Sequence, residues 1–334
     1  MFKTATVALA VLSVAMISSA AQAENWDLPL SWPDTNYISV SAQKFADEVK
    51  TATDSRVEIT LHTGWSLGFK GPEMLSTVGD RLVPIGNMLL NQQVGTEPLL
   101  GMTSLPYFLG SFGELKQFND YFHPTLEKLM EKNNQKLLYT ILWPQQQIWT
   151  KTEVTDLKSL SGIKIRSYDR ASTDVFASAG MTPVQLPWGE VIPSLAAGVI
   201  DAVATSSPSA VDGSFWEFIK YGYPTRHTWN MNAMTVNLDR WNALSKKDQK
   251  AITDLASKLE PSFWQAVQDE DAKNMATLKE PWHHARSDLR RASQGACRPR
   301  RTAAQGYSRQ DGRRCEGDRR RLQAGITTRA ARVN

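Results

Sequence analysis

Strand-like and helix-like segments alternate along the first 142 residues of the chain, and this order constrains the fold most. The strand-like segments are Trp26–Trp32, Val57–Leu61, Leu82–Leu90 and Lys136–Leu142; the helix-like segments are Tyr37–Val49, Glu73–Val78 and Phe112–Met130. The alternation predicts an α/β sheet. A long helical segment, Ala243–Leu278, comes later, and we expect Pro261 to break it.

The N-terminus predicts export. Lys3 precedes an apolar run from Ala5 to Ile17, and the sequence then reads SSAAQA up to Ala23. A charged start, a short apolar run and an Ala-x-Ala site are typical of a signal peptide, here residues 1–23, cleaved after Ala23. The run is shorter than the roughly 20 residues that a membrane-spanning helix needs. We therefore expect a soluble periplasmic protein.

The charge of the chain is divided unevenly. The whole chain carries +4, but residues 281–334 hold 14 arginines, no lysine and four acids, so that they carry +10 and residues 1–280 carry −6. Both cysteines, Cys297 and Cys315, lie in this Arg-rich tail. Two interpretations remain open for residues 281–334: a basic interaction tail, or translation in a shifted reading frame.

Motifs for catalysis or cofactor binding are absent from the sequence. It contains no GxGxxG, GxxxxGK, HExxH, CxxC or GxSxG pattern. His62, His123 and His227 are far apart in sequence, and His283 and His284 are adjacent, which does not suit a metal site on a helix. We therefore expect no enzyme activity, no catalytic residue, no cofactor and no metal.

Arg166 is the first candidate for a binding residue. It follows the apolar run Ile163–Ile165 and precedes a helix-like segment, so a strand should hold its side chain in place. The planar guanidinium can bind a carboxylate through two parallel hydrogen bonds. Arginines in general more often form surface salt bridges, so the residue type and position alone do not decide between the two roles.

The wider pattern resembles the solute-binding proteins of TRAP (tripartite ATP-independent periplasmic) transporters. The segments that carry the resemblance are DLKSLSGIKIR, ending at Arg166, SAGMTPVQLPWGEVIPSLAAGVIDA, ending at Ala202, and, nearer the N-terminus, SLGFKGPEMLSTVGD and TSLPYFLGSFGELKQF. The resemblance covers residues 25–280 and does not extend into 281–334.

The resemblance implies an α/β fold of two lobes with a ligand cleft between them, joined by connecting strands and a long helix. The first lobe would comprise residues 24–145 with return contributions from 206–240, and the second lobe 146–205. Residues 241–280 would form the long helical region. Two crossings between lobes are expected, near Trp143–Lys151 and Thr205–Val211.

The resemblance also implies the ligand site. Arg166 would bind the carboxylate of a small organic acid, Trp188 would be an aromatic residue of the cleft, and Thr205 takes the place of a ligand-binding asparagine. Gln146 takes the place of a second arginine of some members, which favours a monocarboxylate. Ser206 and Trp32 complete the predicted site. Because the chain has 11 tryptophans, several near predicted loops, an aromatic or hydroxy acid suits this cleft.

The expected function is therefore capture of an organic acid and its delivery to TRAP-type membrane permease subunits, without nucleic acid as a partner. Two alternatives remain at this point. One is a periplasmic enzyme, which no motif supports, and the other is a binder of anionic surfaces or nucleic acid, which only the Arg-rich tail suggests.

Overall fold

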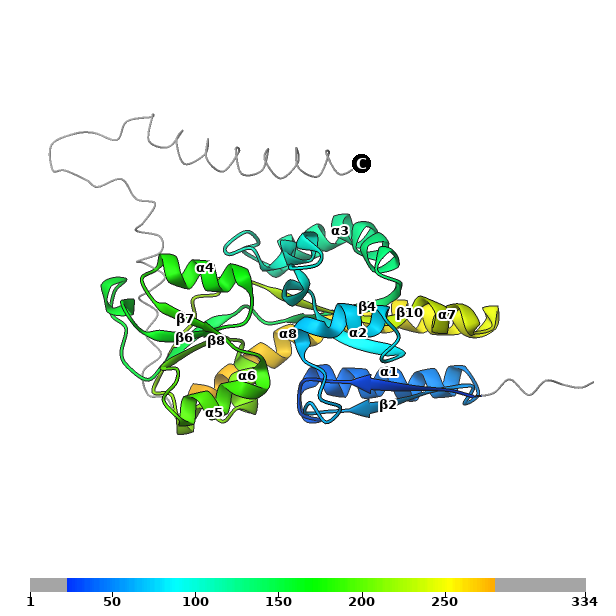
Figure 1. Ribbon diagram of the computed structural model, residues 1–334, viewed down its shortest axis with the longest axis horizontal. Helices are drawn as coiled ribbons and strands as arrows, with labels where there is room; N and C mark the ends of the chain where they lie inside the picture. Colours follow the sequence, from blue (N-terminus) through cyan, green and yellow to red (C-terminus); the bar gives the residue numbers. More distant parts are fainter. Residues whose placement is uncertain (1–22, 280–334) are drawn as a thin grey trace, which may run out of the picture.

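A computed structural model describes residues 23–279 (Figure 1). Residues 1–22 and 280–334 are not described, so the predicted signal peptide apart from Ala23, and the whole Arg-rich tail, lie outside the described residues. Three β-sheets build two lobes, as the resemblance implies: the two-stranded and three-stranded sheets belong to the first lobe and the five-stranded sheet to the second.

The first lobe is built on a three-stranded sheet of order β3-β10-β4, in which β10 is antiparallel to both neighbours. A parallel pair, β1 and β2, lies beside this sheet. The strands are β1 (Glu24–Pro29), β2 (Val57–His62), β3 (Ile85–Leu89), β4 (Gln135–Trp143) and β10 (Asn230–Asn237); the helices are α1 (Tyr37–Ala52), α2 (Met74–Gly79), α3 (Phe112–Lys132) and α7 (Leu238–Ala243).

Alternate residues of the three-stranded sheet point into two separate cores. Met234 and Val236 of β10 face a core shared with α1, whereas Met231 and Ala233 face a core shared with α2 and α3. This period of two is typical of a strand. Short 3₁₀ turns connect these elements, at Gly71–Glu73, Leu90–Gln93 and Pro98–Ser104.

The second lobe is built on a five-stranded sheet of order β7-β6-β8-β5-β9. Its strands are β5 (Gln147–Thr150), β6 (Lys164–Ser167), β7 (Thr182–Gln185), β8 (Ala202–Thr205) and β9 (Tyr221–Tyr223); its helices are α4 (Arg170–Ser178), α5 (Val191–Ala196) and α6 (Ser207–Asp212), with 3₁₀ turns at Lys158–Leu160, Trp188–Glu190 and Phe215–Glu217. Strand β6 is parallel to both β7 and β8. The carboxyl ends of these three strands therefore lie at one edge of the sheet, where ligands of α/β proteins bind.

Within residues 23–279, two loops cross between the lobes. The first crossing, residues 144–146, lies within the predicted segment. The second lies at 224–229, not at Thr205–Val211, because α6 and β9 still belong to the second lobe. Phe215 and Ile219 are buried in the core of that lobe and hold the segment there. Of the segment 206–240 that was expected to return to the first lobe, only the part from β10 onward belongs to that lobe.

Helix α8 (Lys246–Lys279) connects the two lobes along one side (Figure 1). It packs on α1 and β4 in the first lobe and on α6 in the second. The expected break at Pro261 is wrong, because the helix continues through it. Leu259 and Phe263, on either side of the proline, are buried in the same core, and this packing offsets the lost backbone hydrogen bond. Within residues 23–279, no helix has the length and apolar character needed to cross a membrane.

Candidate ligand-binding cleft

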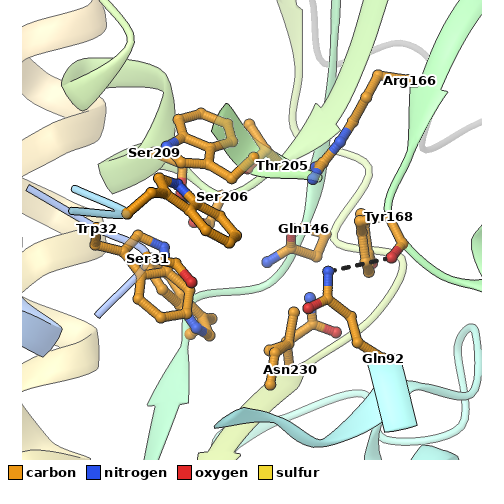
Figure 2. Close-up of a pocket in the computed structure, with 14 residues that line it drawn as sticks. Ser31, Trp32, Gln92, Gln146, Arg166, Tyr168, Thr205, Ser206, Ser209 and Asn230 are labelled. Carbon is orange, nitrogen blue, oxygen red and sulfur yellow. Dashed lines mark hydrogen bonds between the residues drawn. The ribbon is translucent and has the colours of Figure 1, made fainter. Parts of the chain in front are cut away.

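A small pocket of about 50 Å³ lies between the lobes. Fourteen described residues line it, and those labelled in Figure 2 come from both lobes and, with Gln146, from the first crossing. All six residues predicted from the sequence are among them: Trp32, Gln146, Arg166, Trp188, Thr205 and Ser206.

Arg166 lies in β6 and is held by two backbone carbonyls. Its Nε donates to the carbonyl of Leu186 at 3.0 Å, and its Nη1 donates to the carbonyl of Ala204 at 3.1 Å. Within residues 23–279, Nη2 makes no hydrogen bond and no carboxylate forms a salt bridge with Arg166. The guanidinium therefore has a fixed orientation and retains a free donor group.

The electrostatic setting of Arg166 favours an anion in the pocket. The residue is only 4% exposed, and this burial lowers its pKa to about 10, so that it still carries its charge at neutral pH. The rings of Tyr168 and Trp188 lie 5.3 and 5.8 Å from its Cζ atom, close enough for weak cation–π attraction. Arg166 is also the only charged residue among the fourteen described lining residues. The nearby Asp169 opposes the effect of burial on the pKa of Arg166 but forms no salt bridge with it. A buried cation without a direct ion pair is costly, and an anionic ligand in contact with Arg166 would reduce that cost.

Three polar lining residues, Gln146, Thr205 and Ser206, are positioned by the backbone. Gln146 lies in the first crossing, where its amide N–H donates to the carbonyl of Thr228 at 2.8 Å. In Figure 2 its side chain lies between Arg166 and Trp32. Thr205 is the last residue of β8, and the next residue, Ser206, is the N-cap of α6. Both lie beside Arg166 because β8 pairs with β6.

Aromatic side chains form much of the wall of the pocket. Trp32 packs on Trp143 with ring centroids 5.0 Å apart, and Trp188 stacks on Phe215 at 6.2 Å. Trp188 is thus both a lining residue and part of the packing of the second lobe. Among the other tryptophans near predicted loops, Trp149 and Trp229 are buried in the cores, and Trp216 is 38% exposed.

Sequence reasoning missed eight lining residues: Ser31, Trp65, Leu89, Gln92, Trp143, Tyr168, Ser209 and Asn230. Trp143 was noted as lying near a lobe junction but was not assigned to the site. Trp65 lies between Gly64 and Gly68, directly after a strand. An aromatic residue in such a loop is a sign of a binding residue, and this sign could have identified Trp65. Asn230 begins β10, and its position beside Tyr168 depends on a pairing that the local sequence does not encode.

Direct contacts join the two lobes around the pocket. Gln92 of the first lobe donates to the carbonyl of Tyr168 at 3.3 Å (Figure 2), and the side-chain amide of Asn91 donates to Asp169. On another side, Asn36 Nδ2 donates to Asp212 Oδ2 at 2.6 Å. The structure therefore has the lobes in contact and the cleft closed.

Two lobes around a closed cleft, with a fixed cation at the carboxyl edge of a sheet, define a bacterial solute-binding protein. The sequence profile of bacterial extracellular solute-binding protein family 7 (DctP) matches residues 30–303, and the chain belongs to this family, the solute-binding proteins of TRAP transporters. The match continues past residue 280, where the sequence resemblance ended. Relatives in this family are transport proteins rather than enzymes.

Similar proteins share both sequence and fold with this chain. The ectoine/5-hydroxyectoine-binding periplasmic protein UehA of Ruegeria pomeroyi is 27% identical over 261 residues, which are 75% of this chain and 74% of UehA. The crystal structure of DctP7 of Bordetella pertussis, a receptor that binds pyroglutamic acid, is 28% identical with a TM-score of 0.78, covering 82% of this chain and 93% of DctP7. A marine metagenome TRAP protein specific for pyroglutamate is 27% identical with a TM-score of 0.77, covering 83% and 93%.

Proposed function

We propose that this chain captures a small monocarboxylate in the periplasm, binds its carboxylate through Arg166, and delivers it to the membrane permease of a TRAP transporter. The single observation that carries the proposal is the state of Arg166, which is buried, fixed by two carbonyls and free at Nη2; Asp169 lies near enough to attract it but forms no salt bridge with it. A ligand carboxylate supplies the missing direct ion pair and hydrogen-bond acceptors. Each charge-assisted hydrogen bond contributes about 1.5–3 kcal/mol.

The rest of the pocket favours a ligand with a single charge and a compact, ring-like or hydroxylated body. The lining has one cation, so a second carboxylate on the ligand would lie among neutral residues without a partner. The tryptophans offer flat apolar surfaces to the ligand body, while Gln146, Thr205 and Ser206 can bond polar substituents. Aromatic acids, hydroxy acids and cyclic acids such as pyroglutamate fit this description.

The two kinds of relative separate on charge. UehA is named for ectoine, a zwitterion whose ring carries a positive charge, whereas the relatives in solved structures were found with pyroglutamate, which is an anion at neutral pH. The described lining holds no carboxylate that would balance a cationic ring. We therefore favour anions of the pyroglutamate kind over ectoine.

Thermal melting of the purified protein with separate acids tests the proposal. A ligand that binds only the folded state at 100 times its Kd stabilises it by about 2.7 kcal/mol, which raises the Tm by several degrees. We expect shifts with pyroglutamate, lactate or mandelate, and none with ectoine, succinate or duplex DNA. A shift with ectoine or DNA but with none of pyroglutamate, lactate and mandelate would contradict the proposal.

A further inference from the structure

Trp65 is held in an unusual backbone conformation at the mouth of the pocket. Its φ is +67°, in the left-handed region that few residues other than glycine adopt. The loop is tied to the strand segment that carries Ser31 and Trp32: Trp65 N donates to the carbonyl of Leu30 at 3.2 Å, and Gly64 N donates to that of Trp32 at 2.9 Å. The side chain of Trp65 is therefore aimed by the same backbone that positions Trp32.

The indole of Trp65 reaches across the cleft to Gly189 in the second lobe. A Cβ atom built on Gly189 would lie 3.3 Å from Nε1, 3.5 Å from Cδ1 and 3.7 Å from Cε2 of Trp65. Because the three distances are nearly equal, such an atom would sit over the face of the five-membered ring. Gly189 therefore packs flat against the indole, and the N–H points along the ring edge, away from it. Beside this contact, Lys70 and Glu190 approach to 3.9 Å across the same gap.

The indole N–H of Trp65 has no hydrogen-bond partner within residues 23–279, although its nitrogen is buried. An unpaired buried donor costs about 1–3 kcal/mol. The same side chain lines the pocket that contains Arg166. An acceptor atom on the ligand would satisfy this donor, and Arg166 already accounts for the carboxylate.

We propose that Trp65 determines specificity for acids that carry a second oxygen: its N–H donates to a carbonyl or hydroxyl oxygen of the ligand, while its ring closes on Gly189. This inference rests on the proposed monocarboxylate site. It assigns the carboxylate to Arg166 in the second lobe and the second oxygen to Trp65 in the first. The ligand thus bridges the lobes, which couples its chemistry to closure of the cleft.

Calorimetry with matched acid pairs tests the hydrogen bond. The pairs are pyroglutamate and cyclopentanecarboxylate, lactate and propionate, and mandelate and phenylacetate, in which the second acid lacks the second oxygen. The wild-type protein should prefer the oxygenated member of the pair that it binds. Trp65→Phe should weaken that member roughly 3- to 10-fold and leave its partner nearly unchanged, because one neutral hydrogen bond is lost. Trp216→Phe, a change at a half-exposed tryptophan outside the pocket, is the matched control.

The outcomes separate the two proposals. Equal loss for both members in Trp65→Phe, or no loss for either, overturns the role of Trp65 while the acid site stands. Binding of no monocarboxylate by the wild-type protein overturns the proposed function, and this inference with it.

A second pair of variants tests closure on Gly189. Gly189→Val places carbon atoms against the indole face and should weaken binding of every acid roughly fivefold or more. Gly95→Val is the control, since nothing lies within 4 Å of the position where its Cβ would be. Wild-type affinity in Gly189→Val would overturn the packing half of the inference.

Discussion

Asn36 and Asp212 join the two lobes through a hydrogen bond of 2.6 Å between Nδ2 and Oδ2. Asn36 also begins α1, where its side-chain oxygen accepts from the backbone N–H of Ile38. Asp212 ends α6, three residues after Ser209 of the pocket. Each residue is thus fixed within its own lobe, and their bond can form only while the lobes are closed.

Affinity for an acid should rise as the pH falls from 7 to 5. Burial raises the pKa of Asp212 to about 6 in this closed form, although the hydrogen bond from Asn36 lowers it; the charge of Glu270 on α8 adds to the rise. An open cleft would hydrate Asp212 and return its pKa towards 3.8. The closed form then binds a proton more tightly, so closure is favoured by acid and this gain is lost as the pH rises through about 6. Binding should strengthen by up to about tenfold, measured by calorimetry.

Asp212→Asn is the control for this pH dependence. It keeps an acceptor for Asn36 and removes the titrating group, so its affinity at pH 7 should resemble that of the wild type at pH 5 and change little with pH. His227 does not contribute to a pH dependence between 7 and 5, because burial lowers its pKa to about 4, below the range tested. A wild-type affinity that is flat or falling between pH 7 and 5, for a ligand ionised throughout, would contradict the prediction.

Arg166→Ala should reduce affinity for the acid by at least a hundredfold, because about 3 kcal/mol or more of charge-assisted bonding is lost. Arg166→Lys should restore only part of it, since an ammonium is a point charge without the planar fork. The Ala variant should also have a lower Tm without ligand, because the carbonyls of Leu186 and Ala204 lose their donor. Near-native affinity in a folded Arg166→Ala protein would show that Arg166 does not bind the carboxylate of the ligand.

Trp188→Ala should weaken binding by about 1–3 kcal/mol, the range for loss of an aromatic contact. The indole also stacks on Phe215, so Trp188→Ala should lower the Tm as well. Trp188→Phe keeps a ring against Phe215 and separates the two effects: its Tm should recover more than its affinity. Tryptophan fluorescence of the wild type should change on binding, and an unchanged response in Trp188→Ala would show that Trp188 is only a packing residue.

The fold was predictable where local pattern decides it. The expected strand segments Val57–Leu61, Leu82–Leu90 and Lys136–Leu142 correspond to β2, β3 and β4, whereas the central strand β10 was not predicted. Pro261 was misjudged because packing of Leu259 and Phe263 on the first lobe outweighs a local break. The second crossing was misplaced for the same kind of reason, since β9 adds to the edge of a sheet through pairing with β5, which is distant in sequence.

The site was predictable where one motif contains it. Arg166 and Trp188 lie in a single continuous segment, and all six predicted residues line the pocket. Trp65 and Asn230 come from elements 165 residues apart and meet Arg166 only after both lobes have formed. Their unpaired polar atoms, Trp65 Nε1 and Asn230 Oδ1, become visible only once burial is known.

The codons of the Arg-rich tail give a last prediction, which concerns residues outside the described range. Trp282, His283, His284 and Ala285 require the bases TGG CAY CAY GCN, where Y is C or T. Read one base later, the complete codons are GGC, AYC and AYG, which encode Gly, then Ile or Thr, then Met or Thr. Residues 1–280 contain six arginines, whereas the following 54 contain 14, as a shifted frame in a GC-rich gene would produce.

We expect resequencing of the gene to show that the frame changes near residue 281 and that the other frame continues through lysine-bearing amphipathic helices. The family profile matches up to residue 303 and favours the opposite result, a genuine C-terminal segment in the present frame. The DNA sequence after the codon for residue 280 distinguishes the two expectations. Confirmation of the present frame, together with an early stop codon in the later one, would establish the basic tail as real. A continuous later frame would instead remove the Arg-rich tail and its +10 of charge, which is the one feature of the sequence that suggests nucleic acid as a partner.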